Sequence, residues 1–158
     1  MIERLLVPLE EGALGEHAFA TGIDLARQLG AAMIGLVVEP FNAVPHGDLA
    51  MQQHASRLIE PLQRRAAQAG VPFRGIVSQA SDISEAIVAE AEEQHADMIL
   101  MVTHGRGAIG EFLWGANTRR VTARTRLPVM VLRLPAAPLH SGPPASDDDA
   151  ASRDRIAA

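Results

Sequence analysis

The chain contains neither cysteine nor lysine, and each absence excludes a class of chemistry. Without cysteine there are no disulfides, thiolate zinc sites or thiol nucleophiles. All 14 basic residues are arginine, so a P-loop lysine and a Schiff-base lysine are also excluded. The protein therefore belongs to none of the enzyme classes that depend on these groups.

The net charge and the hydropathy pattern show no signal for a nucleic acid or a membrane as binding partner. The net charge of −5 and the pI near 5.6 give no indication of a nucleic acid or an anionic membrane as partner. The N-terminus lacks the basic segment and long apolar stretch of a signal peptide. No run approaches the roughly 20 apolar residues of a membrane span. We expect a soluble, cytoplasmic protein.

The chain divides by composition into one domain and a tail. Its 158 residues, of which 47% are hydrophobic, suffice for one domain with a proper core. From Pro135 onward the sequence is rich in Pro, Ala, Ser and Asp and has no apolar periodicity. This composition predicts a domain over residues 1–134 and a disordered tail over residues 135–158.

Strand-length apolar runs alternate with helical patterns along the domain. Strands are predicted at 4–9, 33–38, 71–78, 97–103 and 129–134, and helices at 17–29, 48–68, 82–95 and 117–126. Such alternation, with near-continuous apolar strands, predicts an α/β fold: an open five-stranded parallel sheet with helices on both faces.

Several residues mark the ends of the predicted helices. Gly30 is a natural stop for the first helix, and Asp48 is a plausible N-cap for the second. Pro61 lies inside that second helix and is expected to kink it. Asp82 and Glu85 form a capping-box pattern at the start of the third helix.

A glycine-punctuated loop at 102–118 carries the most chemistry. It follows the fourth strand, at the carboxyl edge where open parallel sheets bind ligands, and contains Gly105, Gly107, Gly110 and Gly115. Its glycines let backbone N–H groups approach a phosphate, and the helix that follows would direct more N–H groups to it. An equally compatible interpretation makes the glycines turn residues and the nearby arginines a solvated surface.

Single residues of this loop allow two readings each. Asn117 and Thr118 either cap the short helix or donate to an anion. His104 either contacts a phosphate or caps the fourth strand, and we favour the cap. Trp114 is expected to pack under the loop.

The histidines of the chain are not spaced i, i+4, and the chain lacks cysteine, so no metal site is predicted.

Four segments together resemble the universal stress protein family, with similarity over about residues 3–134. They are LLVPLE at 5–10, GLVVEP at 35–40, SDISEAI at 81–87, and ADMILMVTHGRGAIGEFLWGANTRRV followed by LPVMVL. The resemblance implies a Rossmann-like sheet of the adenine nucleotide alpha hydrolase-like type.

Nucleotide-binding members of that family carry Gly, two residues, Gly, nine residues, then Gly and Ser or Thr. Gly105 and Gly115 match the second and third glycines at the same spacing. Val102 replaces the first glycine, and Ala116 replaces the final Ser or Thr. The first replacement adds a β-branched side chain, and the second deletes a hydroxyl that would hydrogen-bond an oxygen.

The resemblance also implies the remaining site residues and the ligand. The adenosine end of the family site corresponds to Pro8, Leu9, Glu10 and Val37, with Glu10 standing where the family has aspartate. The implied ligand is ATP or another adenine nucleotide. A Mg or Mn ion would bridge its phosphates and have no protein ligand.

Three functions remain open at this point. The first is a stress-response regulatory module that binds an adenine nucleotide. The second is a dimeric stress-response or interaction protein with a degenerate site, which Val102 and Ala116 favour. The third, a slow nucleotide hydrolase, ranks last because nothing places a nucleophile beside an acid, so we expect no enzyme.

The last predicted strand indicates a homodimer. The family resemblance implies dimers formed through this strand. Independently, residues 129–134 would form an exposed edge, and such edges are usually paired or covered. We expect Val129 and Val131 at the interface.

Overall fold

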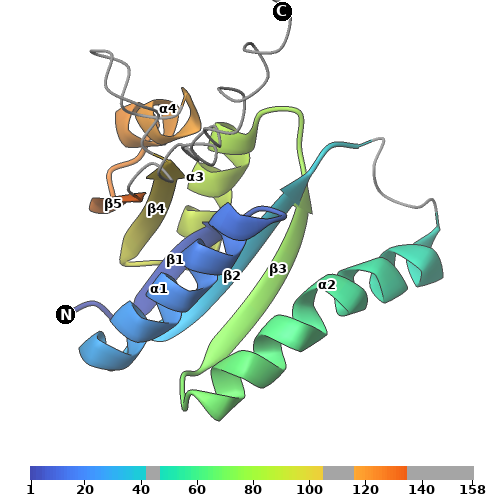
Figure 1. Ribbon diagram of the computed structural model, residues 1–158. Helices are drawn as coiled ribbons and strands as arrows, with labels where there is room; N and C mark the ends of the chain where they lie inside the picture. The colour runs from blue at the N-terminus through green and yellow to red at the C-terminus, as the bar shows by residue number, and fades with distance from the viewer. Residues whose placement is uncertain (42–46, 105–115, 135–158) are drawn as a thin grey trace, which may run out of the picture.

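The computed structural model describes residues 1–41, 47–104 and 116–134, and it confirms the predicted fold (Figure 1). A five-stranded sheet has the order β3-β2-β1-β4-β5, and every strand pair is parallel. The strands are β1 (Arg4–Leu9), β2 (Ala32–Glu39), β3 (Phe73–Gln79), β4 (Met98–His104) and β5 (Val129–Leu134). The helices are α1 (Ala13–Leu29), α2 (Asp48–Gln68), α3 (Ile83–Glu93) and α4 (Ala116–Arg124). The predicted tail at 135–158 and the four loop glycines lie outside the described residues.

Helices cover both faces of the sheet, as the near-continuous apolar strands predict (Figure 1). On one face Leu5 and Val7 of β1 pack with Phe19 of α1. On the other face Leu6 of β1 packs with Ile87 of α3 and Val121 of α4. Successive residues of a strand point to opposite faces, so one apolar strand contributes to two cores.

The β3 side of the sheet is closed by contacts between α1, α2 and β3. Gly75 gives Ile59 of α2 room, since a Cβ at this position would overlap the Ile59 side chain. The rings of Phe19 and Phe73 meet edge to face at 5.9 Å between centroids. Arg65 of α2 lies 4.5 Å above the Phe19 ring and pairs with Glu16 of α1 at 2.9 Å.

The helix ends confirm some predictions and correct one. Gly30 ends α1 in the left-handed conformation, with φ 65°, and Asp82 caps α3 by accepting from the backbone N–H groups of Ser84 and Glu85. The prediction of Asp48 as N-cap is wrong, because Gly47 holds that position. Gly47 has φ 101°, and its carbonyl accepts the first helical hydrogen bond from the N–H of Met51. Helix α2 runs without interruption through Pro61.

The order of strands reverses beside β1, and this reversal positions the site. The chain runs outward from β1 through β2 to β3, then returns to place β4 on the other side of β1. Strands β1 and β4 pair through Leu5↔Met98 and Leu6↔Ile99, and both then continue toward their carboxyl ends. Ligands of open parallel sheets bind at such a reversal point, outside the carboxyl ends of the strands.

Candidate functional site

A cavity of about 270 Å³ opens at the carboxyl edge of the sheet, beside the point where β1 and β4 stop pairing. Strands β1, β2 and β4 form its floor, and helices α1, α3 and α4 form its walls. The lining residues are Pro8, Leu9, Glu10, Leu14, Ala18, Leu36, Val38, Ile83, Ile87, Met101, Val102, Thr103, Ala116, Asn117 and Thr118. Its volume is close to the lower end of the range for small-molecule sites, roughly 300–1,000 Å³.

Most of the predicted site residues converge on this cavity from three separate segments. Those that line it are Pro8, Leu9, Glu10, Val102, Ala116, Asn117 and Thr118. His104 ends β4 at the same edge of the sheet. Gly105, Gly115 and Trp114 lie outside the described residues. The structure therefore brings the two ends of the predicted site together across about a hundred residues of sequence.

Val37 does not line the cavity, whereas its neighbours Leu36 and Val38 do. Val37 packs in the core between the sheet and α1, and Leu36 belongs to the core under α3. Because side chains alternate along a strand, Val37 points to the α1 side of the sheet, whereas Leu36 and Val38 point to the α3 side. An apolar strand without polar alternation does not reveal this choice in its sequence.

Other lining residues escaped the sequence analysis. Ile83 and Ile87 are spaced i, i+4 on α3, which places them on one face of that helix. Leu14 and Ala18 have the same spacing on α1. That spacing is the available signal in the sequence, but it is shared by every core-facing position of these helices.

The cavity is lined mainly by apolar residues, with a few polar groups contributed by the end of β1, by β4 and by α4. Thr103 lies in β4 and Thr118 lies in the first turn of α4, and both are more than nine-tenths buried. Asn117 adjoins Thr118, and Glu10 follows β1 as an exposed carboxylate. The first turn of α4 also contributes the N–H groups and positive dipole end of a helix N-terminus. An apolar ring system with polar or anionic substituents matches this arrangement.

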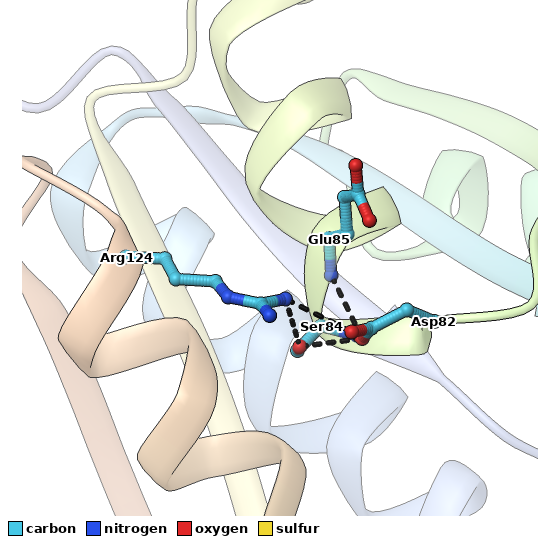
Figure 2. A network of polar contacts seen from close by, with 4 residues as sticks. All are labelled: Asp82, Ser84, Glu85 and Arg124. Atoms are coloured by element: carbon cyan, nitrogen blue, oxygen red, sulfur yellow. Dashed lines mark hydrogen bonds and ion pairs between the residues drawn. The ribbon is translucent and has the colours of Figure 1, made fainter.

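A polar network next to the cavity joins α3 to α4 (Figure 2). Asp82 accepts hydrogen bonds from the Ser84 hydroxyl at 2.6 Å and from the Glu85 N–H at 3.2 Å. Its second oxygen lies 3.0 Å from the Arg124 guanidinium. These contacts, the Ser84 hydroxyl first and Arg124 second, hold the pKa of Asp82 far below its ordinary value. Asp82 is therefore an ionised structural group and a poor general base.

Histidines and carboxylates do not cluster around a common point in the described residues. Within residues 1–41, 47–104 and 116–134, no three or more His, Asp or Glu side chains come close enough together to hold a metal ion. His54 of α2 instead contacts Glu39 of β2, with 2.7 Å between Nε2 and Oε2. In the same described parts of the chain, no helix is both long and apolar enough to cross a lipid bilayer.

A match to a protein-family model over most of the chain identifies the family. The model of the universal stress protein family matches residues 1–133. This chain belongs to that family. It is 28% identical, over 139 residues, to the universal stress protein in the QAH/OAS sulfhydrylase 3'region of Thermus aquaticus, and the alignment covers 84% of this chain and all of that protein.

Solved universal stress proteins share the fold. One in complex with cAMP superposes with a TM-score of 0.64 at 17% identity, covering 84% of this chain and 97% of that one. Another, from Archaeoglobus fulgidus in complex with dAMP, has a TM-score of 0.57 at 18% identity and covers 83% and 98% of the two chains. At these identities the likeness establishes the fold of this universal stress protein, and the ligands belong to those proteins.

Proposed function

We propose that this universal stress protein binds an adenine nucleotide in the cavity beside β1 and β4 and acts as a stress-response regulatory module. The proposal is carried by one observation: residues predicted for the adenosine end and residues predicted for the phosphate end line one cavity at the reversal point of the sheet. They are Pro8, Leu9 and Glu10 for the adenosine end and Val102, Ala116, Asn117 and Thr118 for the phosphate end. Family members of the same fold that were solved with cAMP and dAMP support this ligand class.

In the proposed complex the base lies among apolar side chains of the floor and of the α3 wall. Leu36 and Val38 of β2 and Ile87 of α3 supply that surface. Glu10 accepts from the ribose hydroxyls, and the first turn of α4 donates N–H groups to a phosphate. A Mg or Mn ion would bridge phosphate oxygens, and we assign it no protein ligand.

The proposed role is binding, not catalysis. Asp82 contacts the hydroxyl of Ser84, but its pKa is lowered and its oxygens are engaged by Ser84, Glu85 and Arg124. A base with so low a pKa removes protons poorly at neutral pH. We place the module in the cytoplasm, a compartment supplied with adenine nucleotides.

The test begins with protein purified without added nucleotide. The sample is heat-denatured, and the released small molecules are identified by chromatography. In parallel, thermal unfolding is followed with ATP and magnesium, with cAMP and with dAMP. Release of an adenine nucleotide, or a rise in the melting temperature with one of them, supports the proposal. No release and no shift would contradict it.

A second candidate function is a dimeric interaction protein with an emptied nucleotide site. Val102 and Ala116 favour it, because both line the cavity at positions where nucleotide-binding members carry glycine and a hydroxyl residue. Strand β5 also lies at the edge of the sheet, where a second copy could pair with it. A dimer that neither contains nor responds to nucleotide would favour this candidate.

A further inference from the structure

The polar network of Asp82, Ser84 and Arg124 connects α3 and α4, the helices that form two walls of the cavity (Figure 2). Arg124, the last residue of α4, donates from the same Nη1 to Asp82 Oδ2 at 3.0 Å and to Ser84 Oγ at 2.9 Å. The Ser84 hydroxyl in turn donates to Asp82 Oδ1 at 2.6 Å. The three side chains thus form a closed set of contacts between the start of α3 and the end of α4.

The two charged residues of the network lie at helix ends whose dipoles stabilise them. Asp82 is negative at the N-terminus of α3, and Arg124 is positive in the last turn of α4. Each charge therefore complements the dipole of its own helix. Ser84 is fully buried between them, whereas the side chains of Arg124 and Asp82 are 47% and 28% exposed. The Ser84 hydroxyl therefore anchors a partly exposed ion pair to the buried side of α3.

Helix α4 has few other anchors among the described residues. It is 9 residues long, and its buried members are Thr118 and Val121. Val121 packs into the core under α3 and α4, whereas Thr118 lines the cavity. A helix of this length is a rigid rod of roughly 13 Å. Restraint at Arg124 therefore sets the direction of the opposite end, where Ala116, Asn117 and Thr118 form the cavity wall.

We propose that Arg124 is a positioning residue for the ligand of this cavity, although it does not line the cavity itself. Its contacts with Asp82 and Ser84 hold the first turn of α4 against α3 at the distance that the ligand requires. The network connects to the lining on the other side as well, since Ile83 lies between Asp82 and Ser84 in the sequence and lines the cavity. The proposal rests on the proposed function, because it concerns the affinity of the same site.

The affinity test compares Arg124→Gln with Arg120→Gln, an exposed arginine of the same helix. We expect Arg124→Gln to weaken ATP binding about ten-fold and Arg120→Gln to leave it within two-fold, measured by calorimetry with magnesium present; a ten-fold loss corresponds to about 1.4 kcal/mol. Arg124→Lys keeps the positive charge and is expected to recover part of the loss. Asp82→Asn retains the helix cap but not the carboxylate charge, and its effect should not add to that of Arg124→Gln. Wild-type affinity in Arg124→Gln would overturn the proposal.

A second measurement needs no ligand. Backbone amide exchange is followed in the unliganded protein for α4 and, as an internal reference, for α3. The proposal requires faster exchange at α4 in Arg124→Gln, with α3 nearly unchanged, and no such difference in Arg120→Gln. If the wild-type protein binds no nucleotide, the proposed function fails. The exchange result then decides on its own whether Arg124 restrains α4. Equal exchange at α4 in both variants would overturn it.

Discussion

The backbone of Gly15, in the first turn of α1, packs directly against the carbonyl of Glu10, and no Cβ fits between them. The contact fixes the chain at the point where β1 ends and the cavity begins. We predict that Gly15→Ala destabilises the protein by about 1–3 kcal/mol, the usual range for overpacking. It should also weaken nucleotide binding, because Glu10 must shift.

Urea unfolding and calorimetry check this prediction. At an unhindered helix position, glycine to alanine stabilises by about 0.5–1 kcal/mol, so the sign of the change is diagnostic. A more stable Gly15→Ala protein with unchanged affinity would contradict the packing described for Glu10.

The hydrogen bonds of Asp97 are expected to make the folded protein less stable in acid. Its carboxylate accepts from the N–H groups of Glu3 and Arg4, each at 2.9 Å, and these backbone hydrogen bonds lower its pKa in the folded protein below the ordinary value of 3.8. A lowered folded pKa stabilises the protein above the unfolded value, and this stabilisation is lost as the pH falls through the folded value. We expect Asp97→Asn to lower the melting temperature clearly at pH 7 and much less near pH 2. An equal decrease at both pH values would contradict the assignment.

Patterns of neighbouring residues predicted the fold. The features that the sequence did not predict depend on backbone conformation or on contacts between distant residues. The apolar runs, Gly30 and the Asp82 cap depend on neighbouring residues, and all three predictions are confirmed. Asp48 is one residue too late as a cap because Gly47 adopts a positive φ, which a sequence does not display.

The same distinction applies to the site: its position was predictable from the sequence, but its long-range side-chain contacts were not. The pairing of Arg124 with Asp82 spans 42 positions, so no spacing rule distinguishes Arg124 from the other arginines of its segment. Val37 does not line the cavity, whereas Leu36 and Val38 do, and an apolar strand offers no polar residue that would distinguish these positions in the sequence. The cavity position itself was predictable, because it follows from the order of strands and helices.

Val102 and Ala116 predict that the natural affinity for nucleotide is submaximal. Val102→Gly removes a β-branched side chain from the cavity, and Ala116→Ser supplies a hydroxyl worth about 0.5–1.5 kcal/mol when it hydrogen-bonds an oxygen. We expect the double variant to bind ATP about ten-fold more tightly than the wild-type protein, measured by calorimetry. Val102→Gly alone serves as a control for the lower strand stability that glycine causes. Unchanged affinity in the double variant would show that these positions do not limit binding.

Strand β5 predicts a homodimer. It lies at one edge of the sheet, and Val129 and Val131 are half-buried within it. We expect a dimer in light scattering at micromolar concentration and a shift toward monomer in Val131→Arg, with the circular dichroism spectrum retained. Arg74→Glu, an exposed change on the opposite edge strand β3, is the matched control and should leave the dimer intact. A monomeric wild-type protein would contradict the prediction.

We propose above that an adenine nucleotide occupies the cavity between α4 and the ends of β1 and β4. The most direct test is calorimetric titration of ATP with magnesium into the wild-type protein and into Ala116→Phe, which fills the cavity from an exposed position of α4. We expect saturable binding to the wild-type protein and at least ten-fold weaker binding to Ala116→Phe, with both proteins equally folded. Absence of binding to the wild-type protein, or equal affinity in both, would contradict it.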